Sequence, residues 1–263
     1  MTETRIHTNL VATDRGAVVE LRIDRPEALG ALNFEIMDEI AQFTQSLTHN
    51  RDCRVLIMTG TGKGFVAGAD IVGYQGISQI EFDRFQRKSR KTFDAIAALD
   101  QITICAVNGY ALGGGLELAL CCDFILLSEK AKLGLPEIKL GLLPGGGGTQ
   151  RLSRLIGPMR TKEILLTGRF LSAREAVDLG IALKSLQPDE LLASAREFAD
   201  TLAAQAPIAL SEGKRIIDDS ADTSLANGLT FEQRVLGALF ATEDAKEGID
   251  AFLSKRNPNF VGR

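Results

Sequence analysis

The spacing of apolar residues in the first half of the chain predicts several β-strands. Apolar and polar positions alternate over residues 17–24, which is typical of a strand with one face exposed to solvent. Short continuous apolar runs follow at 55–60, 103–109 and 124–129, and such runs indicate strands that are buried on both faces. We therefore expect a largely buried sheet with one half-exposed strand.

Helical spacing separates these predicted strands. It is found at 34–47, at 80–98 and from residue 114 onward. The resulting order is strand–helix, strand–loop–helix, strand–helix and strand. This order predicts an α/β fold built from repeated units.

The pattern changes from about residue 172, after which we expect helices and no further strands. A helical appendage behind an α/β core often serves as an oligomer surface. The predicted helices lie at 172–180, 189–204, 207–220, 224–240 and 242–256.

Composition narrows the class of protein. The net charge of −4 gives no basic excess that would favour nucleic-acid binding. The four cysteines lie in or beside apolar runs, which is typical of buried thiols in a reducing compartment. With two histidines and no Cys-x-x-Cys motif, we expect no metal site. No stretch of 18 apolar residues occurs, so we expect a soluble, cytoplasmic protein.

The glycine-rich segments are the strongest chemical signal. Residues 62–67, GKGFVA, follow a predicted strand and loosely match the G-x-G-x-x-A motif of dinucleotide-binding proteins. That motif requires a helix at this point, whereas further glycines within 68–76 argue against one. No P-loop motif is present. A nicotinamide dinucleotide site and a P-loop site are therefore disfavoured.

Two glycine segments together indicate a different site. Residues 67–70 (AGAD) form a tight turn, and 113–115 (GGG) open a predicted helix whose dipole is positive at that end. Backbone N–H groups from both segments could converge on one oxygen as an oxyanion hole. Glu117 and Glu137 are then the candidate groups for proton transfer. Glu117 is also simply a favourable anion near a helix N-terminus, and the two roles do not exclude each other.

These segments resemble the crotonase (enoyl-CoA hydratase/isomerase) superfamily, and within it the enoyl-CoA hydratases. The resemblance covers the chain after about residue 15 and implies a spiral of ββα units over 1–171, which contains the acyl-CoA site. It also implies a helical trimerisation region over 172–263, in a trimer or a dimer of trimers. The matching segments are GKGFVAGADI (62–71), AVNGYALGGGLELALCCD (106–123), LPEIKLGLLPGGGGTQRLSRLIG (135–157), LTGRFLSAREAVDLGI (166–181) and EGIDAFLSKRNPNF (247–260).

The resemblance implies hydration of the C2–C3 double bond of a 2-enoyl-CoA. The oxyanion-hole amides correspond to Ala69 and Gly114, and Gly145 matches a position that helps to hold the water. Glu117 and Glu137 match the two acids, with the choice of acid and base left open. Coenzyme A is part of the substrate, and no separate cofactor is expected. Further implied substrate contacts are Glu27, Ala28, Leu29, Ala67, Gly68, Asp70, Ile71, Gly113, Pro136, Phe252 and Lys255.

Several details of this interpretation stay open. Glu27 stands where many family members have Lys or Asn, and it adds no attraction to phosphates. Phe252 and Lys255 match a pair that a neighbouring subunit often contributes. The acyl pocket is expected to be lined by residues 72–82, by the helix that follows them and by residues near 140–145. Tyr74 and Phe82 either narrow a short-chain pocket or pack the loop.

Alternative functions on the same scaffold are an enoyl-CoA isomerase and an acyl-CoA hydrolase. Isomerases generally need only the acid at Glu137, so Glu117 counts against that activity. A hydrolase could use the same two glutamates. A non-catalytic or RNA-associated member of the superfamily is disfavoured by the acidic net charge and by the presence of both acids.

Overall fold

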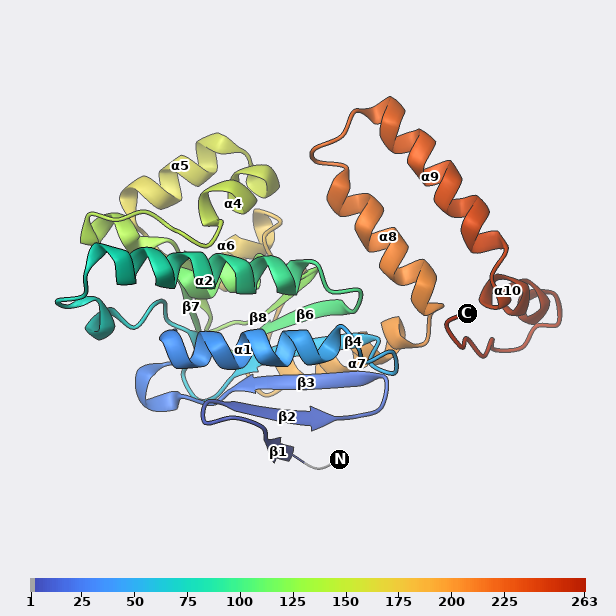
Figure 1. Cartoon of the computed structure of the whole chain (residues 1–263), viewed down its shortest axis with the longest axis horizontal. Coiled ribbons are helices and arrows are strands. Elements are labelled where there is room, and N and C mark those ends of the chain that lie inside the picture. Colours follow the sequence, from blue (N-terminus) through green and yellow to red (C-terminus); the bar gives the residue numbers. More distant parts are fainter. Residues whose placement is uncertain (1–2) are drawn as a thin grey trace.

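A seven-stranded sheet forms the centre of the protein in a computed structural model that describes residues 3–263 (Figure 1). Its strands run in the order β1-β2-β3-β4-β6-β8-β11. The first three pair antiparallel, and pairing from β3 to β11 is parallel. The bounds are β1 Glu3–Arg5, β2 Leu10–Asp14, β3 Val18–Ile23, β4 Val55–Gly60, β6 Ile102–Val107, β8 Phe124–Ser128 and β11 Lys184–Leu186.

A second, four-stranded sheet has the order β10-β9-β7-β5. Three of its strands closely follow strands of the large sheet: β5 after β4, β7 after β6 and β9 after β8. A helix comes next in each case, which gives the ββα repeat. The repeat agrees with the spiral of ββα units that the resemblance implies. The bounds are β5 Gly64–Val66, β7 Tyr110–Leu112, β9 Lys132–Gly134 and β10 Leu171–Ser172.

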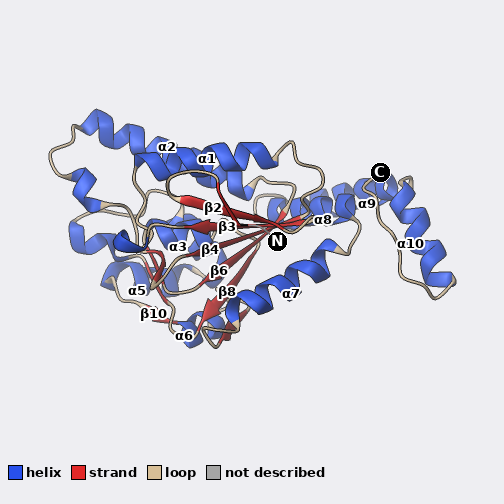
Figure 2. Cartoon of the chain, turned by 90° about the horizontal axis from the view of Figure 1, so that it is seen from below, coloured by secondary structure: helices blue, strands red, loops and turns tan. Residues whose placement is uncertain are grey.

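Helices cover both faces of the large sheet (Figure 2). Helices α1 (Phe34–Leu47) and α2 (Gln79–Ala97) lie on one face, and α7 (Leu191–Ala203) lies on the other. Side-chain caps fix where the first two begin, since Asn33 caps α1 and Ser78 caps α2. The apolar stripe of α7 packs on the strand residues Val55, Ile57 and Ile104 in a core of its own.

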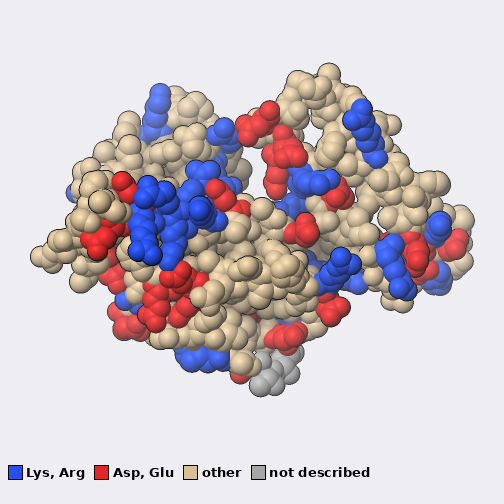
Figure 3. All heavy atoms as spheres, in the orientation of Figure 1, with Lys and Arg blue, Asp and Glu red and all other residues tan. Residues whose placement is uncertain are grey.

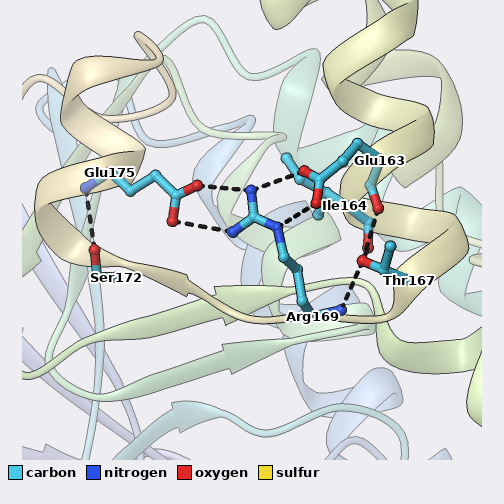
Figure 4. Close-up of polar contacts among 6 residues, drawn as sticks. All are labelled: Glu163, Ile164, Thr167, Arg169, Ser172 and Glu175. Atoms are coloured by element: carbon cyan, nitrogen blue, oxygen red, sulfur yellow. Dashed lines mark hydrogen bonds and ion pairs between the residues drawn. The ribbon is translucent and has the colours of Figure 1, made fainter.

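Four shorter helices lie between β7 and β11 along the chain, and one arginine joins two of them. Arg169 lies between α5 and α6 and forms bidentate pairs with Glu163 on α5 and Glu175 on α6 (Figure 4). Fork-to-carboxylate pairing fixes orientation as well as distance. Arg169 therefore sets how the chain enters α6. The bounds of these helices are α3 Gly114–Ala119, α4 Gly148–Ile156, α5 Pro158–Thr167 and α6 Ala173–Asp178.

The last three helices extend away from the sheets (Figure 2). They are α8 Pro207–Asp219, α9 Leu225–Phe240 and α10 Glu243–Leu253. None of the helices within 3–263 is both long and apolar enough to cross a membrane.

The expectation that strands end near residue 172 is wrong. Strand β11 extends the large sheet by pairing with β8, and α7 packs on the same sheet. The short strand gave no periodic signal, and the helical spacing of α7 does not show what the helix packs against. Packing on the sheet thus continues through α7 to Leu210 on α8, and the helices protrude beyond that point.

Candidate active site

One cavity of about 150 Å³ contains both predicted glutamates. It lies between α2, the start of α3, the loop after β5 and the 3-10 turn Pro136–Leu140. Ten of the residues singled out from the sequence line it, although they come from four separate segments. These are Ala67, Gly68, Ala69, Ile71, Gly113, Gly114, Glu117, Pro136, Glu137 and Gly145.

The glycines at 113–115 are required by close approaches around the start of α3. Gly113 has φ 52° and ψ −121°, a conformation that only glycine adopts easily. A Cβ on Gly115 would overlap the carbonyl oxygen of Val66, so α3 lies directly against β5. Gly114 is the first residue of α3, and its N–H therefore has no acceptor within the helix. This N–H group is available at the wall of the cavity.

Ala69 is held in place by backbone pairing with the segment before α1. The N–H of Leu32 donates to the carbonyl of Gly68, and the N–H of Asp70 donates to the carbonyl of Leu32, both at 2.8 Å. These two bonds flank Ala69, which bridges with Leu32. The second predicted amide thus lies on a fixed loop at the same cavity.

Glu117 is buried and anchored by backbone donors. Only 3% of its surface is exposed. Its Oε1 accepts hydrogen bonds from the N–H groups of Gly146 (2.7 Å) and Gly148 (2.8 Å). Burial raises the pKa of the Glu117 carboxyl, while these N–H groups and the charge of Arg151 oppose the rise. The donors stabilise the ionised form and hold the carboxylate in one orientation.

Glu137 shares the cavity but has fewer partners. It packs against Gly113, where a Cβ would lie 2.8 Å from its Oε1. Its Oε2 is buried and has no hydrogen-bond partner within residues 3–263. Burial raises the pKa of Glu137 to about 7, opposed by its own backbone N–H and increased further by the charge of Glu117. The site therefore combines an anchored carboxyl, whose N–H donors favour its ionised form, with a carboxyl whose pKa of about 7 leaves it partly protonated at neutral pH.

Helix α2 supplies the opposite wall of the cavity. Phe82, Phe85 and Phe93 line it together with Tyr74, whose ring meets Phe82 edge to face at 5.2 Å. The polar residues Gln86 and Ser89 also line this wall. Tyr74 and Phe82 were expected near the acyl pocket. The helix itself was also expected to line the pocket, but the sequence did not single out Phe85, Gln86, Ser89 and Phe93. Positions 82, 85, 86, 89 and 93 form one helical stripe.

In the loop before α1, Leu32 lines the cavity, but the predicted contacts do not. Glu27, Ala28, Leu29 and Asp70 lie outside it, around the side chain of Arg25. This guanidinium donates to Asp70 Oδ2 and to the carbonyl of Ala31, both at 2.7 Å, and lies 3.7 Å from a Glu27 oxygen. Arg25, which the sequence did not single out, therefore braces the loop against the segment that carries Ala69.

Phe252 and Lys255 also lie away from this cavity in the single chain. Phe252, on α10, is 82% exposed and lines a separate apolar hollow of about 420 Å³. Lys255 follows α10 in a left-handed conformation, with φ 52°. Across residues 3–263, no cluster of His, Cys, Asp and Glu side chains could hold a metal ion.

Comparison with known proteins agrees with this geometry. The sequence profile described as "Enoyl-CoA hydratase/isomerase" matches residues 13–263. The chain is 39% identical to a crotonyl-CoA hydratase of Syntrophomonas wolfei, over 98% of this chain and 99% of that protein. It is 38% identical to a short-chain-enoyl-CoA hydratase of Clostridium acetobutylicum, over 94% and 95% of the two chains. The crystal structure of an enoyl-CoA hydratase from Bacillus anthracis superimposes with a TM-score of 0.95 at 36% identity, covering 97% of this chain and all of that one.

The fold and the cavity define a crotonase-fold enzyme. The profile match and the full-length relatives give its place within that class: the chain belongs to the enoyl-CoA hydratase/isomerase family.

Proposed function

We propose that the protein hydrates 2-enoyl-CoA thioesters, adding water across the C2–C3 double bond. The observation that carries this proposal is the pair of glutamates in one buried cavity, beside the glycine-rich start of α3. A hydratase needs one group to take a proton from water and another to give a proton to carbon. The two carboxyls are in environments suited to these opposite roles.

The thioester oxygen is expected to lie at the N–H groups of Ala69 and Gly114. As the double bond is attacked, negative charge moves onto this oxygen and forms an enolate. Two fixed N–H donors stabilise that charge more than they stabilise the uncharged thioester. Removal of one such donor typically costs about 3–4 kcal/mol of transition-state stabilisation.

Glu117 is the proposed base and Glu137 the proposed acid. The Glu117 carboxylate, held by Gly146 and Gly148, takes a proton from the water whose oxygen bonds to C3. The carboxyl of Glu137 gives its proton to C2, and the enolate returns to the thioester. The net result is addition of H₂O, and exchange of protons with solvent resets the pair. Gly145, at the wall beside Gly146, is the proposed contact for the water.

An absorbance assay with crotonyl-CoA tests this function. Hydration removes the absorbance of the conjugated enoyl thioester without releasing free thiol, and we expect this result. Equal release of CoA thiol would instead show an acyl-CoA hydrolase. A shifted double bond without uptake of water would show an isomerase. The assay must measure thiol release because a hydrolase can use the same two glutamates.

We also propose that the active unit is a homotrimer or a dimer of trimers. The protruding helices α8 to α10 carry large apolar side chains that are at least half exposed, a feature typical of an interface. In such an assembly, Phe252 and Lys255 of one subunit would contact coenzyme A bound to the next. The mass of the native protein in solution tests the assembly. The apolar side chains include Ile217, Leu225, Leu229, Leu236, Phe240, Phe252 and Leu253.

The loop around Arg25 is the proposed cover for coenzyme A, with Glu27, Ala28 and Leu29 at its start. The ion pair from Arg25 to Asp70 supports this role, because it ties the cover to the loop that carries Ala69. Both proton transfers use protein carboxyls, so we propose that the reaction requires no additional cofactor.

A further inference from the structure

Three neutral polar groups lie within the aromatic wall of the acyl cavity. Tyr74, Gln86 and Ser89 all line it. Gln86 and Ser89 are one helical turn apart on α2, so they share a face of that helix. The Gln86 amide donates to the Tyr74 hydroxyl oxygen at 3.3 Å, which links Tyr74 to the same stripe. The proposed hydration does not use any of the three.

These groups have hydrogen-bonding capacity that the protein leaves unused. Ser89 is only 6% exposed, yet its buried hydroxyl has no partner within residues 3–263. In the same described part of the chain, the Tyr74 hydroxyl proton and the Gln86 carbonyl oxygen have no partner either, although these two side chains are only partly buried. Buried polar side chains are normally paired, because an unpaired one costs about 1–3 kcal/mol. A group bound in the cavity could therefore accept hydrogen bonds from the hydroxyls of Ser89 and Tyr74. It could donate hydrogen bonds to the Ser89 hydroxyl oxygen and the Gln86 carbonyl oxygen.

The charges around the cavity restrict the kind of occupant. Helix α2 carries Arg84, Arg87, Lys88, Arg90 and Lys91 on its outer side, and Lys and Arg gather over this helix in Figure 3. None of these cations lines the cavity, where the charged residues are Glu117 and Glu137. An anionic substituent would face two carboxyls and no cation, which is unfavourable in a buried site. A neutral polar group avoids that repulsion.

We propose that Tyr74, Gln86 and Ser89 form a polar subsite for a neutral oxygen-bearing substituent, a hydroxyl or carbonyl group, on the acyl chain of the substrate. The subsite lies close to the reacting carbons. A Cβ on Gly145 would overlap the Gln86 carbonyl oxygen, and the next residue, Gly146, donates to Glu117. The substituent therefore sits only a few carbons beyond the double bond. This inference rests on the proposed hydratase function and names its substrate class.

Pairs of substrates with the same shape test the proposal. In (E)-5-hydroxypent-2-enoyl-CoA, a hydroxyl replaces the terminal methyl of (E)-hex-2-enoyl-CoA. The pair (E)-4-hydroxybut-2-enoyl-CoA and (E)-pent-2-enoyl-CoA differs in the same way one carbon earlier. A purely apolar pocket prefers the methyl member of each pair. A site built to bond a hydroxyl rejects the analogue that lacks it, so we expect about tenfold or greater preference in kcat/KM for one of the hydroxylated substrates.

Variants then assign the preference to the subsite. Ser89→Ala, Tyr74→Phe and Gln86→Met each remove hydrogen-bonding capacity at nearly constant shape. Each should reduce the ratio of kcat/KM between hydroxyl and methyl substrates by about threefold or more. Gln79→Met is the matched control, because Gln79 lies exposed at the start of α2 and does not line the cavity. In Gln79→Met, the ratio of kcat/KM between hydroxyl and methyl substrates should equal that of the wild type.

Two results would overturn the subsite. One is preference of the wild type for the methyl member of both pairs. The other is a loss in Gln86→Met that is equal for both members, which would make Gln86 a positioning residue for the attacking water. If the enzyme hydrates no thioester, crotonyl-CoA included, the hydratase proposal fails instead. The subsite is then tested by calorimetry, which measures the Kd of the saturated pair 5-hydroxypentanoyl-CoA and hexanoyl-CoA. Tighter binding of hexanoyl-CoA would refute the subsite.

Discussion

Replacing Glu137 with glutamine should stabilise the protein at pH 8 while it removes activity. Burial raises the pKa of this carboxyl from 4.5 to about 7, with the charge of Glu117 adding to the rise. Between these two values, the folded protein retains a proton that the unfolded chain has released. Wild-type stability therefore falls as pH rises through this window. Glutamine does not titrate, so the free energy of unfolding of the variant does not decrease over this pH range.

The size of the effect follows from the two pKa values. The difference between 4.5 and about 7 corresponds to about 3 kcal/mol of unfolding free energy for a fully buried group. Because the Glu137 side chain is partly exposed, solvent screening reduces this to about 1–2 kcal/mol. For a chain of 263 residues, this change raises Tm by about 2–4 °C.

Thermal unfolding of wild type and Glu137→Gln between pH 5 and pH 8 measures this difference. Protein concentration must be held constant, because assembly makes Tm depend on it. The exposed Glu190 offers a control, and Glu190→Gln should change stability by less than about 0.5 kcal/mol. We expect the Tm advantage of Glu137→Gln to be largest at pH 8 and to shrink toward pH 5. An advantage that is absent at pH 8, or equal at both pH values, would refute the reasoning.

Three further predictions concern the reaction itself. If the proton of Glu137 is needed, kcat/KM should fall above pH 7 and drop about tenfold between pH 8 and pH 9; a flat profile would exclude this role. Gly113→Ala combines an unfavourable φ of 52° with a Cβ 2.8 Å from Glu137 Oε1, which should displace the Glu137 carboxyl. We expect kcat to fall about 100-fold, and an unchanged kcat would contradict the packing of Glu137 against Gly113. Lys255→Ala should raise KM for crotonyl-CoA with little change in kcat, and a penalty of equal size on crotonyl-pantetheine would rule out a contact with the nucleotide.

The larger elements of the fold could be read from the sequence because local signals agreed. Helix α1 begins and ends where the spacing predicted, at 34 and 47, and Asn33 supplies a cap that fits its start. The small sheet was missed because strands such as β5 and β7 are three residues long. Such strands have no measurable periodicity, and only their pairing across the fold defines them.

The catalytic pair and the backbone segments around it were predictable, whereas the individual residues that α2 contributes, such as Gln86 and Ser89, were not. Glu117 and Glu137 lie in glycine-rich segments whose backbone requirements leave a clear sequence pattern. Gln86 and Ser89 lie on the stripe that α2 buries, and a buried stripe has the same spacing whether it faces the core or a cavity. Arg25 was missed because its partners, Asp70 and the Ala31 carbonyl, are brought to it only by folding.

The central claim is that Glu117 and Glu137 add water to the double bond. Incubation of crotonyl-CoA in H₂¹⁸O, followed by mass spectrometry of the acyl group, tests it most directly. The account predicts one ¹⁸O atom in a hydroxyl at C3, no release of CoA, and labelling that is at least about 100-fold slower with Glu117→Gln. Label in a released carboxylate, or labelling by Glu117→Gln at the wild-type rate, would contradict it.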